Sequence, residues 1–370
     1  MQHKSVWLIN KTQKYPMISG SLNADAVVIG GGITGLTTAY LLAREGLKVV
    51  VMEARTIGAG ATGHTTAHIT SQHNLIYHKL LNRLGEKTAQ LAAQANEQAI
   101  DDIEKIINQE KIYCDFTRTD SFLYTNSPKE IKAIENEEKT ARSFGIDAEL
   151  VHDMPFLQPY LVALRYKNQA MFNPIQYING LAEAIIRMDG QIFEKSRVLH
   201  IQEDKVSGKT GIVKAKHIII ATHYPIINFP GMYFARIYQD RSYCVAAENA
   251  PALPSMWNAT MSNGCSFRPY ENMLIISGGS HRTGTKGNTS HYEQLENFVS
   301  EQLPGTDISY KWSAQDGFTL DDMPYIGRYS KRSDNMYVAT GYAKWGMTYS
   351  NVAGHVICDL ITGHKNPYVE

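Results

Sequence analysis

The feature that most constrains this chain is a short run of glycines placed between a strand and a helix. The glycines that form the pattern G-x-G-x-x-G are Gly30, Gly32 and Gly35. The β-branched run 26–29 before them predicts a buried strand, the apolar spacing of 33–45 predicts a helix, and 48–52 predicts a second buried strand. Glycines at these positions permit a tight turn and a close approach of the backbone to a pyrophosphate, which a helix N-terminus attracts. The segment therefore predicts a βαβ nucleotide-binding unit.

An acidic residue, Glu53, follows the second predicted strand. A carboxylate at this place accepts hydrogen bonds from both ribose hydroxyls and disfavours a 2′-phosphate. Three further segments favour FAD over NAD, because a molecule as long as FAD needs remote parts of the chain to hold it. They are the second glycine-rich run 58–63, the strand 217–221 with Thr222 after it, and the segment 339–348 before the last helix. A plain NAD dehydrogenase is the weaker alternative, because it leaves these segments unexplained.

Composition excludes several classes of protein. The 370 residues include 36 Lys and Arg and 36 Asp and Glu, so the formal net charge is zero and we expect no nucleic-acid partner. The longest apolar stretch, 26–43, is interrupted by glycines and threonines, so we expect no membrane span. Residues 1–16 lack the apolar core of a signal peptide, and the four cysteines form no disulfide or metal motif. These features predict a reducing, cytoplasmic location.

The pattern along the rest of the chain predicts an α/β protein with two domains. Helical periodicity recurs in 85–109, 128–144, 175–188 and 348–361, whereas 228–313 is rich in tyrosines, prolines and strand-like segments with one helix, 291–302. We expect a Rossmann-like FAD-binding domain made of residues 1–110, 150–228 and 318–370. A second, substrate domain, an α+β unit with an antiparallel sheet, is expected to be inserted as residues 111–149 and 229–317.

In their order along the chain, these segments resemble the FAD-dependent D-amino-acid oxidase (DAO) superfamily, which includes glycine oxidase and monomeric sarcosine oxidase. The resemblance rests on VVIGGGITG (27–35) with Glu53, GAGATGHTTAHI (58–69), IIIAT (218–222), ISGG (276–279), DDMPYIG (321–327) and YVATGYAKWGM (337–347). More narrowly, the chain is similar to bacterial members that often carry a C-terminal Rieske domain and to γ-glutamylputrescine oxidoreductases. The resemblance implies a flavoprotein of the GR2/DAO type that oxidises the C–N bond of an amine or amino acid by hydride transfer to flavin N5.

The motifs and the resemblance together give a set of expected FAD contacts. These are Gly30, Gly32, Ile33, Thr34, Gly35, Glu53, Ala54, Arg55, Gly60, Ala61, Thr62, His64, Thr65, Thr66, Ala221, Thr222, Gly341, Gly346, Met347 and Thr348.

The expected catalytic residues lie on segments that should face the flavin ring and the substrate. They are Tyr342, Lys344, Trp345 and Arg282. Lys344 is expected to stabilise reduced flavin, Tyr342 and Trp345 to wall the substrate cavity, and Arg282 to reach a substrate anion. A solvated lysine, core aromatic residues and a surface arginine are the alternatives. Arg241, on another predicted strand, is placed similarly to Arg282.

The chain departs from the family pattern in the stretch 312–317. Members that act on amino acids commonly place an arginine and a proline after the tryptophan, where this chain has Gln315 and Asp316. The change argues against simple α-amino acids, and Asp316 suits a cationic amine or is a turn residue. The stretch has no cysteine to attach flavin, so His64 is expected to wall the flavin pocket, with a covalent link as the weaker alternative. His64 and His68 lack the glutamate of a zinc motif, and we expect no metal.

Two other functions remain open. No Cys-x-His pair exists in these 370 residues, so they build no Rieske cluster, and the chain is either a stand-alone member or a fragment of a longer one. An electron-transfer flavoprotein with an iron–sulfur protein as its electron acceptor is the main alternative to an enzyme that takes a small amine or amino acid. The flavin module of a tRNA-modifying enzyme is disfavoured by the zero net charge.

Overall fold

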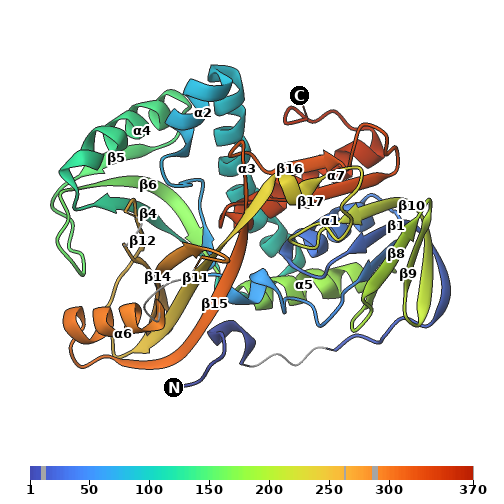
Figure 1. The fold of residues 1–370 in the computed structure, drawn as a ribbon, viewed down its shortest axis with the longest axis horizontal. Helices are drawn as coiled ribbons and strands as arrows, with labels where there is room; N and C mark the ends of the chain where they lie inside the picture. The colour runs from blue at the N-terminus through green and yellow to red at the C-terminus, as the bar shows by residue number, and fades with distance from the viewer. Residues whose placement is uncertain (10–13, 262–263, 286–290, 370) are drawn as a thin grey trace.

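A computed structural model describes residues 1–9, 14–261, 264–285 and 291–369, and two β-sheets dominate this part of the chain (Figure 1). Residues 10–13 of the N-terminal segment considered above therefore lie outside the described residues. In Figure 1 the first sheet lies at the right with helices α1, α5 and α7, and the second sheet lies at the left.

The first sheet has the order β16-β17-β10-β1-β2-β7, with β8 and β9 attached beside β10. Its strands are β1 Gly20–Ile29, β2 Val49–Met52, β7 Gln191–Phe193, β8 Val198–Gln202, β9 Lys205–Gly208, β10 Gly211–Ile220, β16 Tyr325–Arg328 and β17 Met336–Thr340. Strand β1 pairs in parallel with both β2 and β10. Val27 and Val28, which point to opposite faces, are both fully buried, as a continuous apolar run predicts for a central parallel strand.

The second sheet has the order β15-β11-β14-β13-β12-β4-β6-β3, with β5 beside β6. Its strands are β3 His68–Ile69, β4 Thr117–Thr125, β5 Ala148–Val151, β6 Val162–Met171, β11 Ile237–Glu248, β12 Met256–Ala259, β13 Ser266–Tyr270, β14 Met273–Arg282 and β15 Asp307–Thr319. The long strands β11 and β15 run toward the first sheet through the middle of Figure 1. Their ends carry side chains of the second sheet to the nucleotide-binding unit.

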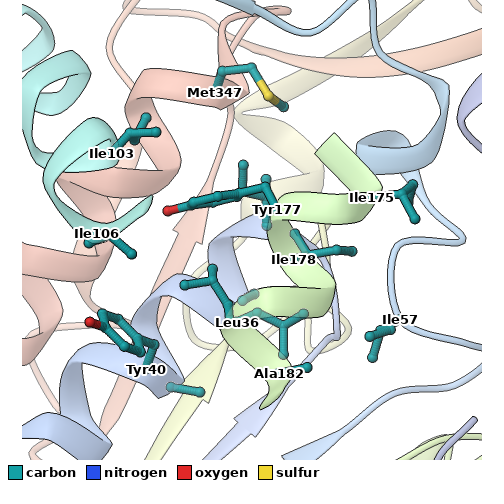
Figure 2. Close-up of a cluster of buried hydrophobic side chains, with 14 of the residues drawn as sticks. Leu36, Tyr40, Ile57, Ile103, Ile106, Ile175, Tyr177, Ile178, Ala182 and Met347 are labelled. Carbon is teal, nitrogen blue, oxygen red and sulfur yellow. The ribbon is translucent and has the colours of Figure 1, made fainter. Parts of the chain in front are cut away.

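Helices cover the sheets. They are α1 Ile33–Arg44, α2 Ile76–Leu84, α3 Glu86–Glu110, α4 Ile131–Ser143, α5 Pro174–Arg187, α6 His291–Gln302 and α7 Gly346–Thr362, with the 3-10 helices η1 Val6–Leu8, η2 Ala61–His64, η3 Pro128–Glu130 and η4 Tyr233–Ala235. Helices α1, α3, α5 and α7 share one hydrophobic cluster, whereas α2 and α4 pack in a second and α6 in a third. Helix α5 begins at Pro174 because the Asn173 side chain accepts hydrogen bonds from the next two free N–H groups. Figure 2 shows Leu36 of α1, Ile103 of α3 and Tyr177 of α5 in the buried cluster between these helices.

The predicted fold class is confirmed: a Rossmann-like α/β unit stands beside a largely antiparallel sheet, in which β4 and β12 pair in parallel. The predicted helix over 33–45 is α1, and the predicted strand over 217–221 is the second half of the longer strand β10. The second sheet includes strands that the predicted boundaries place in the FAD-binding domain. Strand β3, at 68–69, and strand β6, at 162–171, were expected there, but β6 pairs with β3, β4 and β5 in the second sheet. The remaining boundaries stay a prediction.

Candidate active site

The first glycine-rich turn brings three segments of the backbone into contact. Gly30 follows β1 with φ +114°, and a Cβ built on it would lie 2.4 Å from the carbonyl oxygen of Ala221 at the end of β10. A Cβ on Gly35 in α1 would lie 1.9 Å from the carbonyl oxygen of Gly30. These two glycines therefore permit the close packing of β1, β10 and α1. Gly32 precedes α1 and has no side chain to cap its N-terminus, so the helix end offers N–H groups to a ligand, apart from that of Ile33, which is bonded to the Thr62 hydroxyl.

Glu53 stands directly after β2 and faces the same turn. Its carboxylate accepts hydrogen bonds from the N–H of Gly31 at 2.8 Å and from the N–H of Arg55 at 2.7 Å. These bonds fix the orientation of the carboxylate at the edge of a large cavity. A carboxylate oxygen has more than one lone pair, so both oxygens retain capacity for the hydroxyls of a ribose. The position fits the adenosine end of FAD.

The cavity has a volume of about 790 Å³ and lies between the two sheets. Ligand pockets in proteins range over roughly 300–1,000 Å³. Among the expected FAD contacts, those in the lining are Gly30, Gly32, Ile33, Thr34, Glu53, Ala54, Arg55, Gly60, Ala61, Thr62, His64, Thr65, Thr66, Ala221, Thr222, Gly341, Gly346 and Met347. Gly35 and Thr348 lie outside it. The lining thus brings together four distant segments of the chain, as an extended dinucleotide requires.

The second glycine-rich segment packs against the first. The Thr62 hydroxyl oxygen accepts a hydrogen bond from the Ile33 N–H at 3.0 Å, and this bond ties η2 to the start of α1. The Nδ1 atom of His64 lies 2.8 Å from the carbonyl oxygen of Gly60, and the half-buried ring lines the cavity. His68 lies elsewhere: it is buried, with its Nδ1 atom 3.3 Å from the Asn258 amide. Within the described residues, no group of three or more His, Cys, Asp or Glu side chains is arranged to hold a metal ion.

The segment between β17 and α7 forms a tight turn beside the cavity. Gly341 has φ +82°, and a Cβ there would lie 2.4 Å from the Thr319 side chain. Tyr342 and Lys344 line the cavity, and burial raises the pKa of the Tyr342 hydroxyl. Trp345 instead stacks on buried His73, with ring centroids 4.9 Å apart. The turn therefore divides its aromatic residues between the cavity and the core.

Thr348 and Arg282 also point away from the cavity. The Thr348 side chain is buried, and its hydroxyl lies 3.1 Å from Nε2 of His73, which gives it a hydrogen-bond partner there. The Arg282 guanidinium lies over the Tyr238 ring, 5.0 Å from its centroid. Of the four expected catalytic residues, the structure brings Tyr342 and Lys344 to the cavity but not Trp345 or Arg282.

Two aspartates are paired across β11 and β15 near the sheet end of the cavity, and of the two Asp316 belongs to its lining. Asp240 of β11 and Asp316 of β15 are direct partners in the strand register. Lys344 Nζ lies 3.0 Å from a carboxylate oxygen of Asp240 and donates to the Ser280 hydroxyl at 2.7 Å. Burial raises the pKa of Asp316, whereas His223 and Lys344 oppose that rise. Lys344 thus makes its ion pair with Asp240, and Asp316 lines the cavity without such a contact among the described ion pairs.

Arg241, beside Asp240, also lines the cavity. Its guanidinium donates to the Gln315 side-chain oxygen at 2.9 Å and to the Ser313 hydroxyl at 3.5 Å. Both partners are neutral, and no carboxylate pairs with Arg241 among the ion pairs of the described residues. A guanidinium in this setting is available to a ligand anion.

Sequence reasoning missed much of the wall that the second sheet contributes. The added lining residues there include Ser242, Cys244, Ser277, Ser313 and Ala314, and Arg197 and His223 join from other segments. Ser277 belongs to the ISGG run and Ser313 and Ala314 to the stretch 312–317, but neither pattern places these side chains in the cavity. Ser242, Cys244, Ser313 and Ala314 are brought together by the pairing of β11 with β15, which depends on a register that only the folded sheet reveals.

Comparison with known proteins defines the class of this chain. The family model of FAD-dependent oxidoreductases, DAO, matches residues 25–360. The chain belongs to this family, and FAD is its cofactor. In the described part of the chain, no helix is both long and apolar enough to cross a membrane.

Individual relatives cover nearly the whole chain. It is 36% identical to the "Putative Rieske 2Fe-2S iron-sulfur protein YhfW" of Bacillus subtilis, over 96% of this chain and 72% of the relative. It is 25% identical to the gamma-glutamylputrescine oxidoreductase of Escherichia coli, over 96% of this chain and 86% of the relative. The crystal structure of glycine oxidase from Geobacillus kaustophilus matches with a TM-score of 0.79 at 19% identity, and covers 93% of this chain and 96% of that one. At 19% identity, the similarity to this glycine oxidase shows a shared fold.

Proposed function

We propose that this FAD-dependent oxidoreductase oxidises the C–N bond of a small amine that also carries a carboxylate, an amino acid in the broad sense. The proposal rests on two side chains of opposite charge that line the sheet end of the cavity, Arg241 and Asp316. FAD supplies the hydride acceptor when it is bound. The protein's own share is to hold the substrate in position and to exclude water.

Arg241 is the proposed partner of the substrate carboxylate. The stretch 312–317 lacks the arginine that related enzymes for amino acids commonly have, but Arg241 lies opposite Gln315 in the neighbouring strand. The guanidinium therefore reaches the cavity from β11 instead of β15. Because its protein partners are neutral, a carboxylate bound there gains a charge-assisted, bidentate contact.

Asp316 is the proposed partner of the substrate amine. Lys344 makes its ion pair with Asp240, the register partner of Asp316, so the Asp316 carboxyl group is available to a cationic amine. Its raised pKa makes it a suitable group to take a proton from the bound ammonium, and hydride loss requires a neutral amine. The names of relatives agree with this class of substrate: they include gamma-glutamylputrescine oxidoreductase, glycine oxidase and L-proline dehydrogenase.

Anaerobic reduction of the bound flavin tests the proposal. Amino acids and the amines that lack their carboxylate are added in turn, and the loss of oxidised-flavin absorbance is followed. We expect carboxylate-bearing amines to reduce the flavin, and Arg241→Gln to weaken their apparent binding about 10- to 100-fold, the loss of a charged hydrogen bond. Arg241→Lys should recover part of that loss, and Arg328→Gln, on the exposed end of β16, should have no effect. The proposal is wrong if no carboxylate-bearing amine reduces the flavin, or if Arg241→Gln discriminates as the unchanged protein does.

A second candidate function is an electron-transfer flavoprotein that works with a Rieske-type partner. One observation favours it, the name of the relative that is 36% identical. Rapid flavin reoxidation by a Rieske protein, together with a lack of reduction by any amine, would support this alternative.

A reducing, cytoplasmic location also belongs to the proposal and is supported by four unpaired, buried cysteines.

A further inference from the structure

Three consecutive carbonyl groups beside the cavity each accept a hydrogen bond from a large side chain of a distant segment. The carbonyl oxygen of His64 accepts from Nε1 of Trp312 at 2.9 Å. That of Thr65 accepts from Nε1 of Trp7 at 2.7 Å, and that of Thr66 accepts from Nη1 of Arg268 at 2.8 Å. The backbone of this segment is therefore fixed at three successive peptide groups.

The three donors come from outside the nucleotide-binding unit and are all buried. Trp7 lies in η1, Arg268 in β13 and Trp312 in β15, and their exposures are 3%, 2% and 4%. The Arg268 guanidinium lies over the Trp7 ring, 4.9 Å from its centroid, and its second amino group donates to the Phe172 carbonyl at 2.7 Å. Arg268 has no carboxylate partner among the ion pairs of the described residues, and burial lowers its pKa to about 9. Its hydrogen bonds are thus made to backbone carbonyls.

Because the peptide group is planar, a hydrogen bond that fixes the direction of a carbonyl also fixes the direction of the N–H in the same peptide group. In a trans peptide group the C=O and the following N–H point in opposite directions. The bond from Trp312 to the His64 carbonyl therefore fixes the direction of the Thr65 N–H, and the bond from Trp7 to the Thr65 carbonyl fixes the direction of the Thr66 N–H. Thr65 and Thr66 line the cavity, and neither N–H meets an acceptor among the hydrogen bonds of the described residues. The next N–H, of Ala67, is already bonded to the Thr65 hydroxyl at 2.9 Å.

We propose that Trp7, Arg268 and Trp312 form a carbonyl clamp, in which Trp312 and Trp7 orient the Thr65 and Thr66 N–H groups toward acceptor atoms of bound FAD and Arg268 fixes the next peptide group. The clamp residues are positioning residues, since they act through the backbone and not by touching the cofactor. Two fixed N–H donors that need not reorganise on binding favour an acceptor more than mobile donors do. The inference concerns the cofactor alone and does not depend on which substrate the enzyme takes.

The clamp also connects the cofactor segment to the substrate end of the cavity. Trp312 immediately precedes Ser313, whose hydroxyl contacts Arg241. In the strand register, Trp312 lies opposite Cys244, which lines the cavity. One short piece of β15 thus positions both the backbone at His64 and the wall around Arg241.

Single replacements that remove a donor and keep a ring test the clamp. Trp312→Phe and Trp7→Phe each lose one indole N–H. In substrate-free protein we expect either change to weaken FAD binding to the apoprotein roughly two- to tenfold, the loss of one neutral hydrogen bond. We also expect a shift in the flavin absorption spectrum and in its reduction potential, which a merely structural role would leave unchanged. FAD titration, absorbance and potentiometry provide these readouts without any turnover.

Trp257→Phe is the matched control. Trp257 is fully buried in the second sheet, away from the cavity lining, and its Nε1 donates to the Ser255 hydroxyl at 2.9 Å. This variant should lose thermal stability yet leave the flavin spectrum and potential unchanged. Unaltered affinity, spectrum and potential in both clamp variants would overturn the proposal, as would equal shifts in Trp257→Phe.

Hydrogen exchange in the unchanged protein gives an independent test should the variants fold poorly. The backbone amides of Thr65 and Thr66 should exchange in the apoprotein and become protected when FAD binds. Equal exchange rates in the two forms would contradict the proposed orientation.

Discussion

Two carboxylates of this chain, half-buried Glu53 and fully buried Glu137, accept hydrogen bonds from backbone N–H groups and have no cationic partner among the ion pairs of the described residues. Glu53 accepts from the N–H groups of Gly31 and Arg55, as described for the cavity edge. Glu137 in α4 is fully buried and accepts from the N–H groups of Tyr77 and His78 in the first turn of α2, at 2.8 Å each. Each such carboxylate joins segments that are distant in sequence. For Glu137 the backbone donors compensate burial only in part, and burial raises its pKa, so this group makes stability depend on pH.

Glu137 allows a definite prediction for pH. Burial raises its pKa from 4.5 to about 7, so the folded protein holds a proton that the unfolded chain has released between these values. By linkage, the free energy of unfolding falls as pH rises from about 4.5 to 7, by at most about 3 kcal/mol from this group. Glu137→Gln should remove this decline. Urea unfolding at a series of pH values between 4 and 8 measures it.

Glu135→Gln provides the comparison, because Glu135 is on the same helix but is partly exposed and pairs with Lys132. This variant should follow the pH dependence of the unchanged protein. A Glu137→Gln variant with the same slope as the unchanged protein would show that Glu137 ionises normally in the fold.

At the scale of elements, the contact between β1 and α1 depends on glycine more than on any side chain. Gly35 lies inside α1, outside the cavity, where a Cβ would overlap the Gly30 carbonyl at 1.9 Å. Gly46 lies just beyond the same helix with φ +80°, and a Cβ there would meet no atom within 4 Å. Alanine at Gly35 would therefore test the free-energy cost of steric overlap, and alanine at Gly46 would test the free-energy cost of a left-handed backbone conformation.

We expect Gly35→Ala to destabilise the protein by about 3 kcal/mol or more, because α1 must move away from β1. Gly46→Ala should cost only about 1 kcal/mol, since its strain is local. The free energy of unfolding from urea titration distinguishes the two variants. If Gly35→Ala proves no more harmful than Gly46→Ala, the close packing of α1 on β1 is not required.

Elements with an internal period could be predicted from the sequence, whereas elements defined by their neighbours could not. The helix α6 was predicted at its observed bounds, and the glycine pattern placed α1 to within one residue. Strand β6 was not predicted, because Arg165 and Lys167 interrupt its apolar pattern. In the folded sheet these side chains form ion pairs with Asp120 and Glu149 on the paired strands. The same reason applies to the cavity. Its cofactor end follows from local motifs, but its sheet end follows from the register of β11 with β15.

At the scale of the whole molecule, the cavity is a shared interior of the two sheets. The ends of β1, β10 and β17 line it on one side and β11, β14 and β15 line it on the other. A ligand that fills this space therefore contacts both sheets at once. FAD should contribute to the stability of the whole fold, because it binds the folded chain only.

Removal of FAD should lower the Tm, and restoring it should raise the Tm with its concentration. At a free concentration 100 times Kd, FAD is expected to stabilise the fold by about 2.7 kcal/mol, which corresponds to about 3 °C for a chain of this length. Thermal melts of apoprotein at several FAD concentrations measure the effect. A Tm that is independent of FAD would show that the cofactor binds elsewhere or binds the unfolded chain equally.

The position of the first residues has a practical consequence for anyone who prepares this protein. The Gln2 N–H donates to the Ser309 carbonyl at 2.8 Å, and the Lys311 N–H donates to the Gln2 carbonyl at 3.0 Å, so the N-terminal segment is attached to the edge of β15. Trp7 lies only five residues further on. A purification tag fused to Met1 would therefore disturb the segment that holds Trp7 in place beside the prosthetic group. Protein for spectroscopy is better tagged at the C-terminus.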